Sequence, residues 1–206
     1  MSEILKSLIS FLAILNPFAL CLYVGGMMGE LDMRQFLRVM IGACVISFVV
    51  FALFALTGET ILVEWLNIHP GALRSFGGLV FLVVGYNYVT TGYRAAEKLR
   101  GSLEGLPSAI AMPFMIGAGT ITQSIIIGKQ HSGNKSVLIL LVGLTIAFGV
   151  VLAFKVVSDR VKGRREAVFE RYVNILARIN GLIIGAISIE MIVLGLRSVW
   201  NAPQAS

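Results

Sequence analysis

The sequence is poor in the residues that carry out chemistry in most enzymes. Its two histidines, His69 and His131, have no partners at the spacing of a metal site, and its two aspartates, Asp32 and Asp159, are expected in loops. It has no HExxH motif, no nucleotide-binding loop and no paired aspartates within an apolar segment. These absences argue against an enzyme, and no cofactor or metal is expected.

Charge is also scarce. Only 14% of the 206 residues are charged whereas 57% are hydrophobic, and uncharged runs of about 20 residues, enough to cross a bilayer as a helix, recur along the chain. We therefore expect an integral membrane protein that forms one transmembrane domain over residues 1–206. Cys21 and Cys44 both fall inside apolar runs, so no disulfide is expected.

The apolar runs predict an all-α protein. Segments such as FVVFALFAL are apolar on every side, whereas the strands of a membrane barrel would alternate apolar and polar residues. Six transmembrane helices are predicted at about Ile4 to Met28, Phe36 to Leu56, Ala72 to Tyr93, Pro107 to Gly128, Ser136 to Val157 and Tyr172 to Val199.

The basic residues sort by side of the membrane. The loops after the first, third and fifth spans, with their flanks, carry Arg34, Arg38, Arg94, Lys98, Arg100, Lys155, Arg160, Lys162, Arg164, Arg165, Arg171 and Arg178. The opposite side carries only Lys6, Arg74, Lys129, Lys135 and Arg197. The positive-inside rule places the first group in the cytoplasm and both termini outside it. The net charge of +6 therefore predicts contact with anionic lipid at the basic loops, and not with nucleic acid.

Two of the predicted spans contain a proline that would break the helix. Asn16 and Pro17 interrupt ILNPFALCLYVGG, and Pro113 takes the same place in AMPFMIGAGTITQ of the fourth span. Proline removes an amide donor and clashes with the carbonyl four residues earlier. For either proline alone, an ordinary kink repaired by neighbouring groups is the simpler explanation.

The two breaks belong to an internal repeat. RSFGGLVFLVVGY from Arg74 and RINGLIIGAISIE from Arg178 share Arg-x-x-Gly followed by an apolar run. The chain therefore divides into a three-helix unit at 1–93, a cytoplasmic linker at 94–106 and a second unit at 107–206. Because three is odd, the second unit is inverted in the membrane. Paired broken helices in inverted halves indicate the midplane binding site of a secondary transporter.

The chain resembles the MarC family of inner-membrane proteins, which includes small neutral amino acid transporters. The resemblance rests on Asn16-Pro17-Phe18, the stretch from Gly117 to Thr122, Arg74-x-x-Gly77-Gly78 and the stretch from Arg178 to Leu182, in the same order over nearly the whole chain. The chain departs from the usual family pattern at Ala19, Leu22 and Ala118. The resemblance implies transport of glycine, alanine and similar amino acids across the inner membrane.

The polar and breaking residues of the spans supply the candidate site. We expect substrate contact from Asn16, Pro17, Phe18, Pro113, Gly117, Gly119, Thr120, Thr122, Gln123 and Asn180. Four of them have a structural alternative. Asn16 could be only a helix cap, Thr120 and Thr122 could be bonded to their own helix, and Gln123 could be a link between helices. Glu190, the one acidic residue placed inside a span, is the candidate for proton coupling, unless it reaches water in the outer half of the bilayer.

Two other functions stay open at this point. A channel could also use broken helices with glycine-rich turns, although the sequence has no clear ring-forming motif. A membrane scaffold without transport would leave the paired breaks unexplained. The oligomeric state cannot be read from the sequence.

Overall fold

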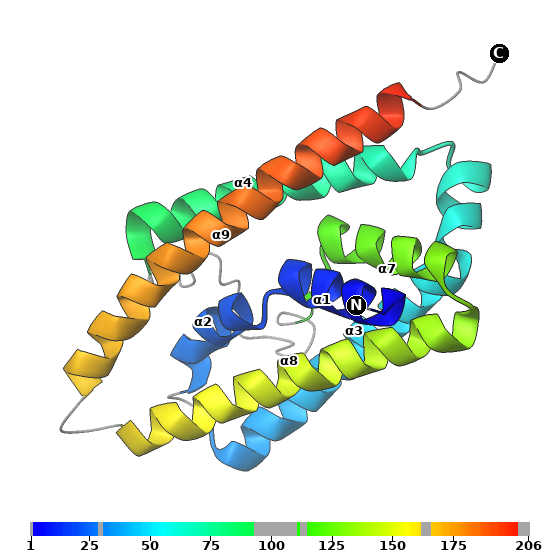
Figure 1. The fold of residues 1–206 in the computed structure, drawn as a ribbon. Coiled ribbons are helices and arrows are strands. Elements are labelled where there is room, and N and C mark those ends of the chain that lie inside the picture. The colour runs from blue at the N-terminus through cyan, green and yellow to red at the C-terminus, as the bar shows by residue number, and fades with distance from the viewer. Residues whose placement is uncertain (1, 29–30, 93–110, 112–114, 162–165, 202–206) are drawn as a thin grey trace.

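The computed structural model describes residues 2–28, 31–92, 111, 115–161 and 166–201, which form a set of packed helices (Figure 1). These are α1 (Glu3–Leu15), α2 (Pro17–Met28), α3 (Met33–Glu59), the π-helix η1 (Thr60–Trp65), α4 (Pro70–Thr91), α7 (Ala118–Gln130), α8 (Gly133–Val161) and α9 (Glu166–Trp200). The described residues contain no strand, and the predicted all-α class is confirmed for them.

Five stretches are long and apolar enough to cross a membrane. They are Glu3–Gly25, Met33–Gly58, Pro70–Thr91, Gly133–Val161 and Arg171–Trp200. They match the first, second, third, fifth and sixth predicted spans, with ends that differ from the predicted ones by a few residues. The fourth predicted span begins outside the described residues. Its described helix, α7, has 13 residues and a length of about 20 Å, which is too short to cross a bilayer alone.

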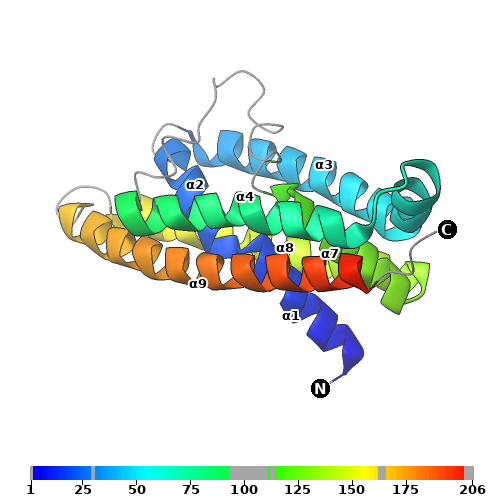
Figure 2. The same ribbon diagram turned by 90° about the horizontal axis from the view of Figure 1, so that it is seen from above.

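The helices lie in layers around the two short helices of the first span. α4 and α9 lie side by side along their length in both views, with α3 and α8 on the opposite side of the molecule (Figures 1 and 2). Between these layers lie α1, α2 and α7. Phe11 of α1 and Phe51 of α3 meet edge to face with their ring centroids 5.5 Å apart, and both side chains are fully buried. The interrupted first span therefore packs against both layers, while the start of α1 extends beyond α9 (Figure 2).

α4 and α9 approach each other through a row of small residues. A Cβ atom placed on Gly71 would lie 2.6 Å from the carbonyl oxygen of Gly195, and one on Gly85 would lie 3.0 Å from that of Gly181. Gly78 meets the carbonyl of Ser188 midway between them. The contacts recur every seven residues on both helices, which is the repeat of helices crossing at a shallow angle. These positions hold the two helices close together.

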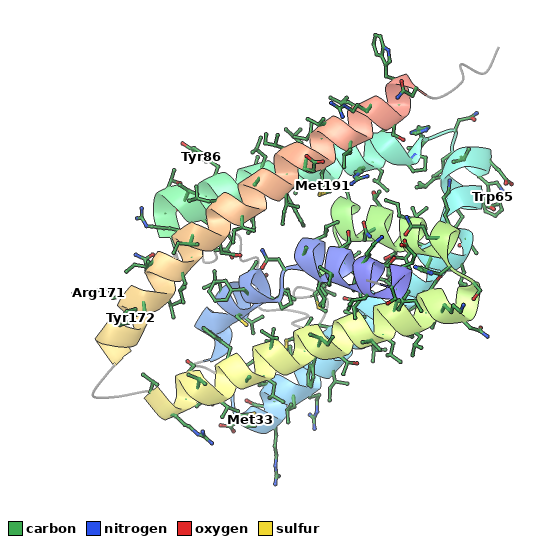
Figure 3. The ribbon with its side chains drawn as sticks, in the orientation of Figure 1. Met33, Trp65, Tyr86, Arg171, Tyr172 and Met191 are labelled. Atoms are coloured by element: carbon green, nitrogen blue, oxygen red, sulfur yellow. The ribbon has the colours of Figure 1, made fainter. Side chains whose placement is uncertain are left out.

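The outer faces and the two ends have the character of a membrane protein. Large aliphatic side chains are exposed on the outside of α3, α4, α8 and α9, for example Val83 and Leu182. Trp65 lies at one end of the bundle and Tyr172 at the other (Figure 3), as expected of rings in the two interfaces. The two ends of the bundle carry different residues of the predicted basic groups. Arg34 and Arg171 lie near the starts of α3 and α9, at the end opposite the start of α4 and the end of α7, where His69 and Lys129 lie (Figure 1). Six residues of the predicted basic loops lie outside the described residues: Arg94, Lys98, Arg100, Lys162, Arg164 and Arg165.

Candidate functional site

The first predicted break is present, and Asn16 forms it. This residue has φ of 47° and ψ of 76°, a left-handed conformation in which asparagine is one of the few tolerated residues. Its amide N–H donates to the carbonyl of Leu12 (2.9 Å) and ends α1, while its side-chain Oδ1 accepts from the N–H of Ala19 (3.1 Å) and caps α2. Pro17 is the first residue of α2, the position where a missing N–H costs least. The capping role predicted for Asn16 is confirmed.

The other half of the Asn16 amide reaches across to the last helix. Its Nδ2 donates to Oδ1 of Asn180 on α9 at 3.1 Å. Asn180 is 7% exposed, and among the described residues its own Nδ2 has no hydrogen-bond partner. A buried amide donor without an acceptor costs free energy, so such groups in native proteins call for an explanation. Two residues 164 positions apart, both predicted for the site, are thus in direct contact.

The second break lies just before α7. The N–H of Ile116 donates to the carbonyl of Ala111, five residues earlier, and the regular helix starts only at Ala118, with Gly117 as its N-cap. Thr120 is fully buried, and its Oγ1 accepts from the N–H of Gly117 (2.9 Å) and lies 2.8 Å from the carbonyl oxygen of Met115. The Thr120 hydroxyl therefore stabilises the break itself.

The two breaks lie close together in space. A Cβ atom placed on Gly119 would lie 3.1 Å from Cγ2 of Ile14 in α1 and 2.9 Å from Cε of Met191 in α9. Met191 lies on the side of α9 that faces α1 and α7 (Figure 3). From α4, Gly77 approaches so closely that its Cβ would lie 2.6 Å from the Gly119 nitrogen. α1 therefore ends next to the point where α7 begins, with α4 and α9 covering the junction.

A cavity of about 280 Å³ adjoins the first break. Its wall is apolar except for Asn16, and comes from the end of α1, the start of α2, α4 and α9: Ile14, Leu15, Asn16, Ala19, Leu20, Val80, Phe81, Val83, Val84 and Ile184. We call it the apolar cavity. Most of these lining residues were not predicted, because single aliphatic residues in an apolar span carry no signal in one sequence.

The remaining predicted site residues are placed in different ways. The Thr122 hydroxyl donates to the carbonyl of Ala118 (2.7 Å), and Gln123 is buried without a hydrogen bond to another described residue. Phe18 is partly buried in the apolar cluster that contains Ala19, Leu22 and Tyr88. Pro113 lies outside the described residues.

Glu190 is exposed on α9 and does not lie among the residues around the two breaks. Its carboxylate interacts electrostatically with Arg74 of α4. The structure therefore gives Glu190 a basic neighbour, and its predicted part in proton coupling stays a prediction.

Lys155 is buried, although the sequence predicted it only as one of the basic residues that flank the cytoplasmic loops. It is 2% exposed, and its Nζ lies 2.8 Å from Oδ2 of Asp159 and donates to the carbonyl of Leu31 (3.2 Å) between α2 and α3. Its ammonium also lies 5.9 Å from the ring centroid of Phe36. The aspartate four residues later on the same helix was the available signal. This contact joins α8 to the start of α3.

In the described part of the chain, His, Cys, Asp and Glu side chains do not come together in groups of three.

The sequence is similar to a known family over almost its full length. A family described as "MarC family integral membrane protein" matches residues 1–200. Among similar proteins, the UPF0056 membrane protein PH0214 of Pyrococcus horikoshii is 26% identical, with 95% of this chain and 94% of that protein covered. The UPF0056 membrane protein MJ1677 of Methanocaldococcus jannaschii is 32% identical, with 70% and 71% covered. No solved structure matches the chain.

The helices, the apolar outer faces and the paired breaks define a multi-pass integral membrane protein. The chain belongs to the MarC family of integral membrane proteins, and the predicted family resemblance is confirmed.

Proposed function

We propose that this protein is a secondary transporter of small neutral amino acids of the glycine and alanine class. It works by alternating access in the cell inner membrane, with its substrate site where the two breaks meet. The observation that carries the proposal is the buried Asn16–Asn180 contact, in which the Asn180 Nδ2 has no acceptor among the described residues. A substrate carboxylate beside this amide would supply the missing acceptor.

The helix ends at the junction suit a zwitterion. At the start of α7, the N–H groups of Ala118, Gly119 and Thr120 have no acceptor within the helix, and the helix dipole adds positive potential there. At the end of α1, the carbonyls of Ala13, Ile14 and Leu15 have no donor within the helix, and they carry negative potential. Since Ile14 and Gly119 are in contact, the two ends face one region. A substrate in this region can place its carboxylate between the Asn180 amide and the start of α7, and its ammonium beside the unpaired carbonyls of α1.

The apolar cavity explains a preference for small neutral side chains. A cavity of about 280 Å³ with an aliphatic wall accepts a hydrogen or a methyl group without cost. A charged side chain placed there would lose its hydration without gaining a partner. The substrate backbone is therefore bound by polar groups at the junction, and its side chain by the aliphatic wall.

The pattern of helix contacts supports two inverted three-helix repeats. In this arrangement α4 corresponds to α9, α3 to α8, and the pair α1 and α2 to the span that ends in α7. Several contacts then have a counterpart: α1 and α2 pack on α8 as α7 packs on α3, and α4 packs on α7 as α2 packs on α9. α4 and α9 pair with each other, as equivalent helices beside a two-fold axis do. The end of the bundle that carries Arg34 and Arg171 faces the cytoplasm and binds anionic lipid there. Both termini then lie outside the cytoplasm.

The experiment is counterflow of radiolabelled alanine and glycine in proteoliposomes loaded with unlabelled substrate. A carrier gives uptake that saturates and is inhibited by the other small amino acid but not by lysine. Uptake of ions that rises linearly with their gradient, without saturable exchange of amino acids, would instead establish the channel. Absence of both fluxes, with the protein folded and correctly reconstituted, would overturn the proposal in favour of a scaffold. A pH gradient tests Glu190: proton coupling predicts faster uptake in the wild type and no such effect in Glu190→Gln.

A further inference from the structure

A second cavity lies at the end of the bundle where α4 begins and where α7 and α9 end (Figure 1). It has a volume of about 300 Å³ and is lined by His69, Pro70, Gly71, Arg74, Thr122, Ile125, Ile126, Lys129 and Ser198. We call it the basic cavity. It is large enough for a molecule of a few heavy atoms, and its wall contains more polar groups than that of the apolar cavity.

The polar groups around the basic cavity are mainly hydrogen-bond donors. Arg74 and Lys129 carry permanent positive charge, and Ser198 adds a hydroxyl. Nδ1 of His69 accepts from the N–H of Gly71 (3.0 Å), so the proton of the neutral ring sits on Nε2, which is left as a donor. A small solute with a carboxylate matches this set of donors.

Two acidic residues lie beside the basic cavity and reduce the net positive charge of this region. The carboxylate of Glu190 attracts Arg74 from α9 and balances part of its charge. Glu64 lines an adjoining cavity of about 220 Å³, which we call the side cavity, together with Thr57 and Thr60. Lys129 and Ile125 line both cavities, so the two spaces are neighbours. The region therefore has two cationic side chains, Arg74 and Lys129, and an acidic one, Glu64, which lines the side cavity together with Lys129.

We propose that the basic and side cavities together form a second binding site for a small zwitterionic solute. The carboxylate of the solute lies beside Arg74 and Lys129, and its ammonium lies beside Glu64. The identification of this solute as the transported amino acid rests on the proposed function. The charge pattern of the site is independent of that function.

Thr122 connects this second site to the substrate site. It is buried, lines the basic cavity, and its hydroxyl bonds the carbonyl of Ala118 in the first turn of α7. The second site thus lies one turn along α7 from the second break, at the end of the bundle that the positive-inside rule places outside the cytoplasm. A solute held there is positioned next to the substrate site before it enters.

The test is equilibrium binding of radiolabelled glycine to the purified full-length protein carrying Asn16→Gly, which removes the amide of the first break. The proposal predicts that this variant retains glycine binding that acetate and ethylamine, each with one of the two charges, compete for weakly. Adding Arg74→Gln or Lys129→Gln weakens the retained binding by about tenfold, the loss expected for one charge-assisted hydrogen bond. Adding Glu64→Gln weakens glycine but leaves acetate unchanged.

The matched control is Lys135→Gln, an exposed lysine at the start of α8 that lines neither cavity. Lys129→Gln and Glu64→Gln change exposed residues, so they keep the test valid if Arg74→Gln does not fold. Loss of all glycine binding in Asn16→Gly, or equal binding by the Lys129→Gln, Glu64→Gln and Lys135→Gln variants, overturns the proposal. If Lys129→Gln weakens glycine binding but the wild type shows no counterflow, the second site is supported and the proposed transport function is overturned.

Discussion

Gly78 of α4 lies against the backbone of Ser188 in α9, so that a Cβ atom on Gly78 would be 2.7 Å from the Ser188 carbonyl oxygen. No real Cβ atom tolerates this distance from a backbone atom, so even one methyl group forces the two helices apart. Because α4 and α9 together cover the junction of the two breaks, their spacing determines how tightly the candidate site is enclosed.

Gly78→Ala should therefore destabilise the protein, although alanine favours helix more than glycine does. We expect the free energy of unfolding to fall by about 1–3 kcal/mol, the usual cost of overpacking. The control is Gly149→Ala in α8, where no other described residue, apart from the neighbouring backbone of α8 itself, has an atom within 4 Å of the added methyl group. Unfolding by SDS in mixed micelles measures both. Equal stability of the two variants would show that the α4–α9 spacing is not constrained as described.

Lys155→Met should also destabilise the protein. It removes the ammonium from Asp159 and from the Leu31 carbonyl, and we expect a loss of about 2 kcal/mol because both partners are part of a charged hydrogen-bonded group. Arg160→Met, an exposed change in the last turn of the same helix, is the control. The same unfolding measurement applies, and a Lys155→Met protein as stable as the control would contradict a structural role for this contact.

The backbone of Asn16 gives a prediction that separates conformation from side-chain chemistry. Glycine adopts φ of 47° freely, whereas alanine at this position is strained by about 1–2 kcal/mol. Asn16→Ala should thus be less stable than Asn16→Gly by about that amount, although both lose the cap and the contact with Asn180. The difference in midpoint temperature of thermal unfolding measures it, and a more stable Asn16→Ala would rule out the left-handed turn.

Gly119 should show a rescue by a partner on another helix. A methyl group there meets Cε of Met191, so Gly119→Ala is expected to displace the start of α7 and to slow transport. Shortening the partner in the Gly119→Ala, Met191→Ala double variant should restore part of the lost rate, whereas Met191→Ala alone should not accelerate the wild type. Counterflow rates at equal reconstituted protein measure this. If the losses of counterflow rate in the two single variants simply add in the double variant, the contact between Gly119 and Met191 is contradicted.

Much of the fold follows from sequence because a bilayer limits the choice. Apolar runs of about 20 residues must be helices, so five of the predicted spans are found near their predicted positions. The Asn16-Pro17 break was also predictable, since proline fixes its own φ and lacks an N–H whatever surrounds it. Both signals are local, and neither depends on how the helices pack.

The parts that depend on packing were not predictable. Asn16 and Asn180 were predicted separately for the site, but their direct contact depends on how α9 crosses the first break. The burial of Lys155 and the closeness of Ile14, Gly119 and Met191 likewise depend on distances between helices that one sequence does not contain. The inverted repeat was inferred from short matching motifs, and it stays a prediction that the contact pattern supports.

The central claim is that substrate binds at the Asn16–Asn180 contact, and alanine counterflow in proteoliposomes carrying wild type, Asn16→Gly or Asn134→Ala tests it most directly. Asn16→Gly keeps the left-handed turn and removes only the amide, while Asn134→Ala changes an exposed asparagine at the start of α8. The account predicts saturable exchange by the wild type and Asn134→Ala, and exchange reduced by about tenfold or more in Asn16→Gly. Equal exchange by all three proteins would contradict it.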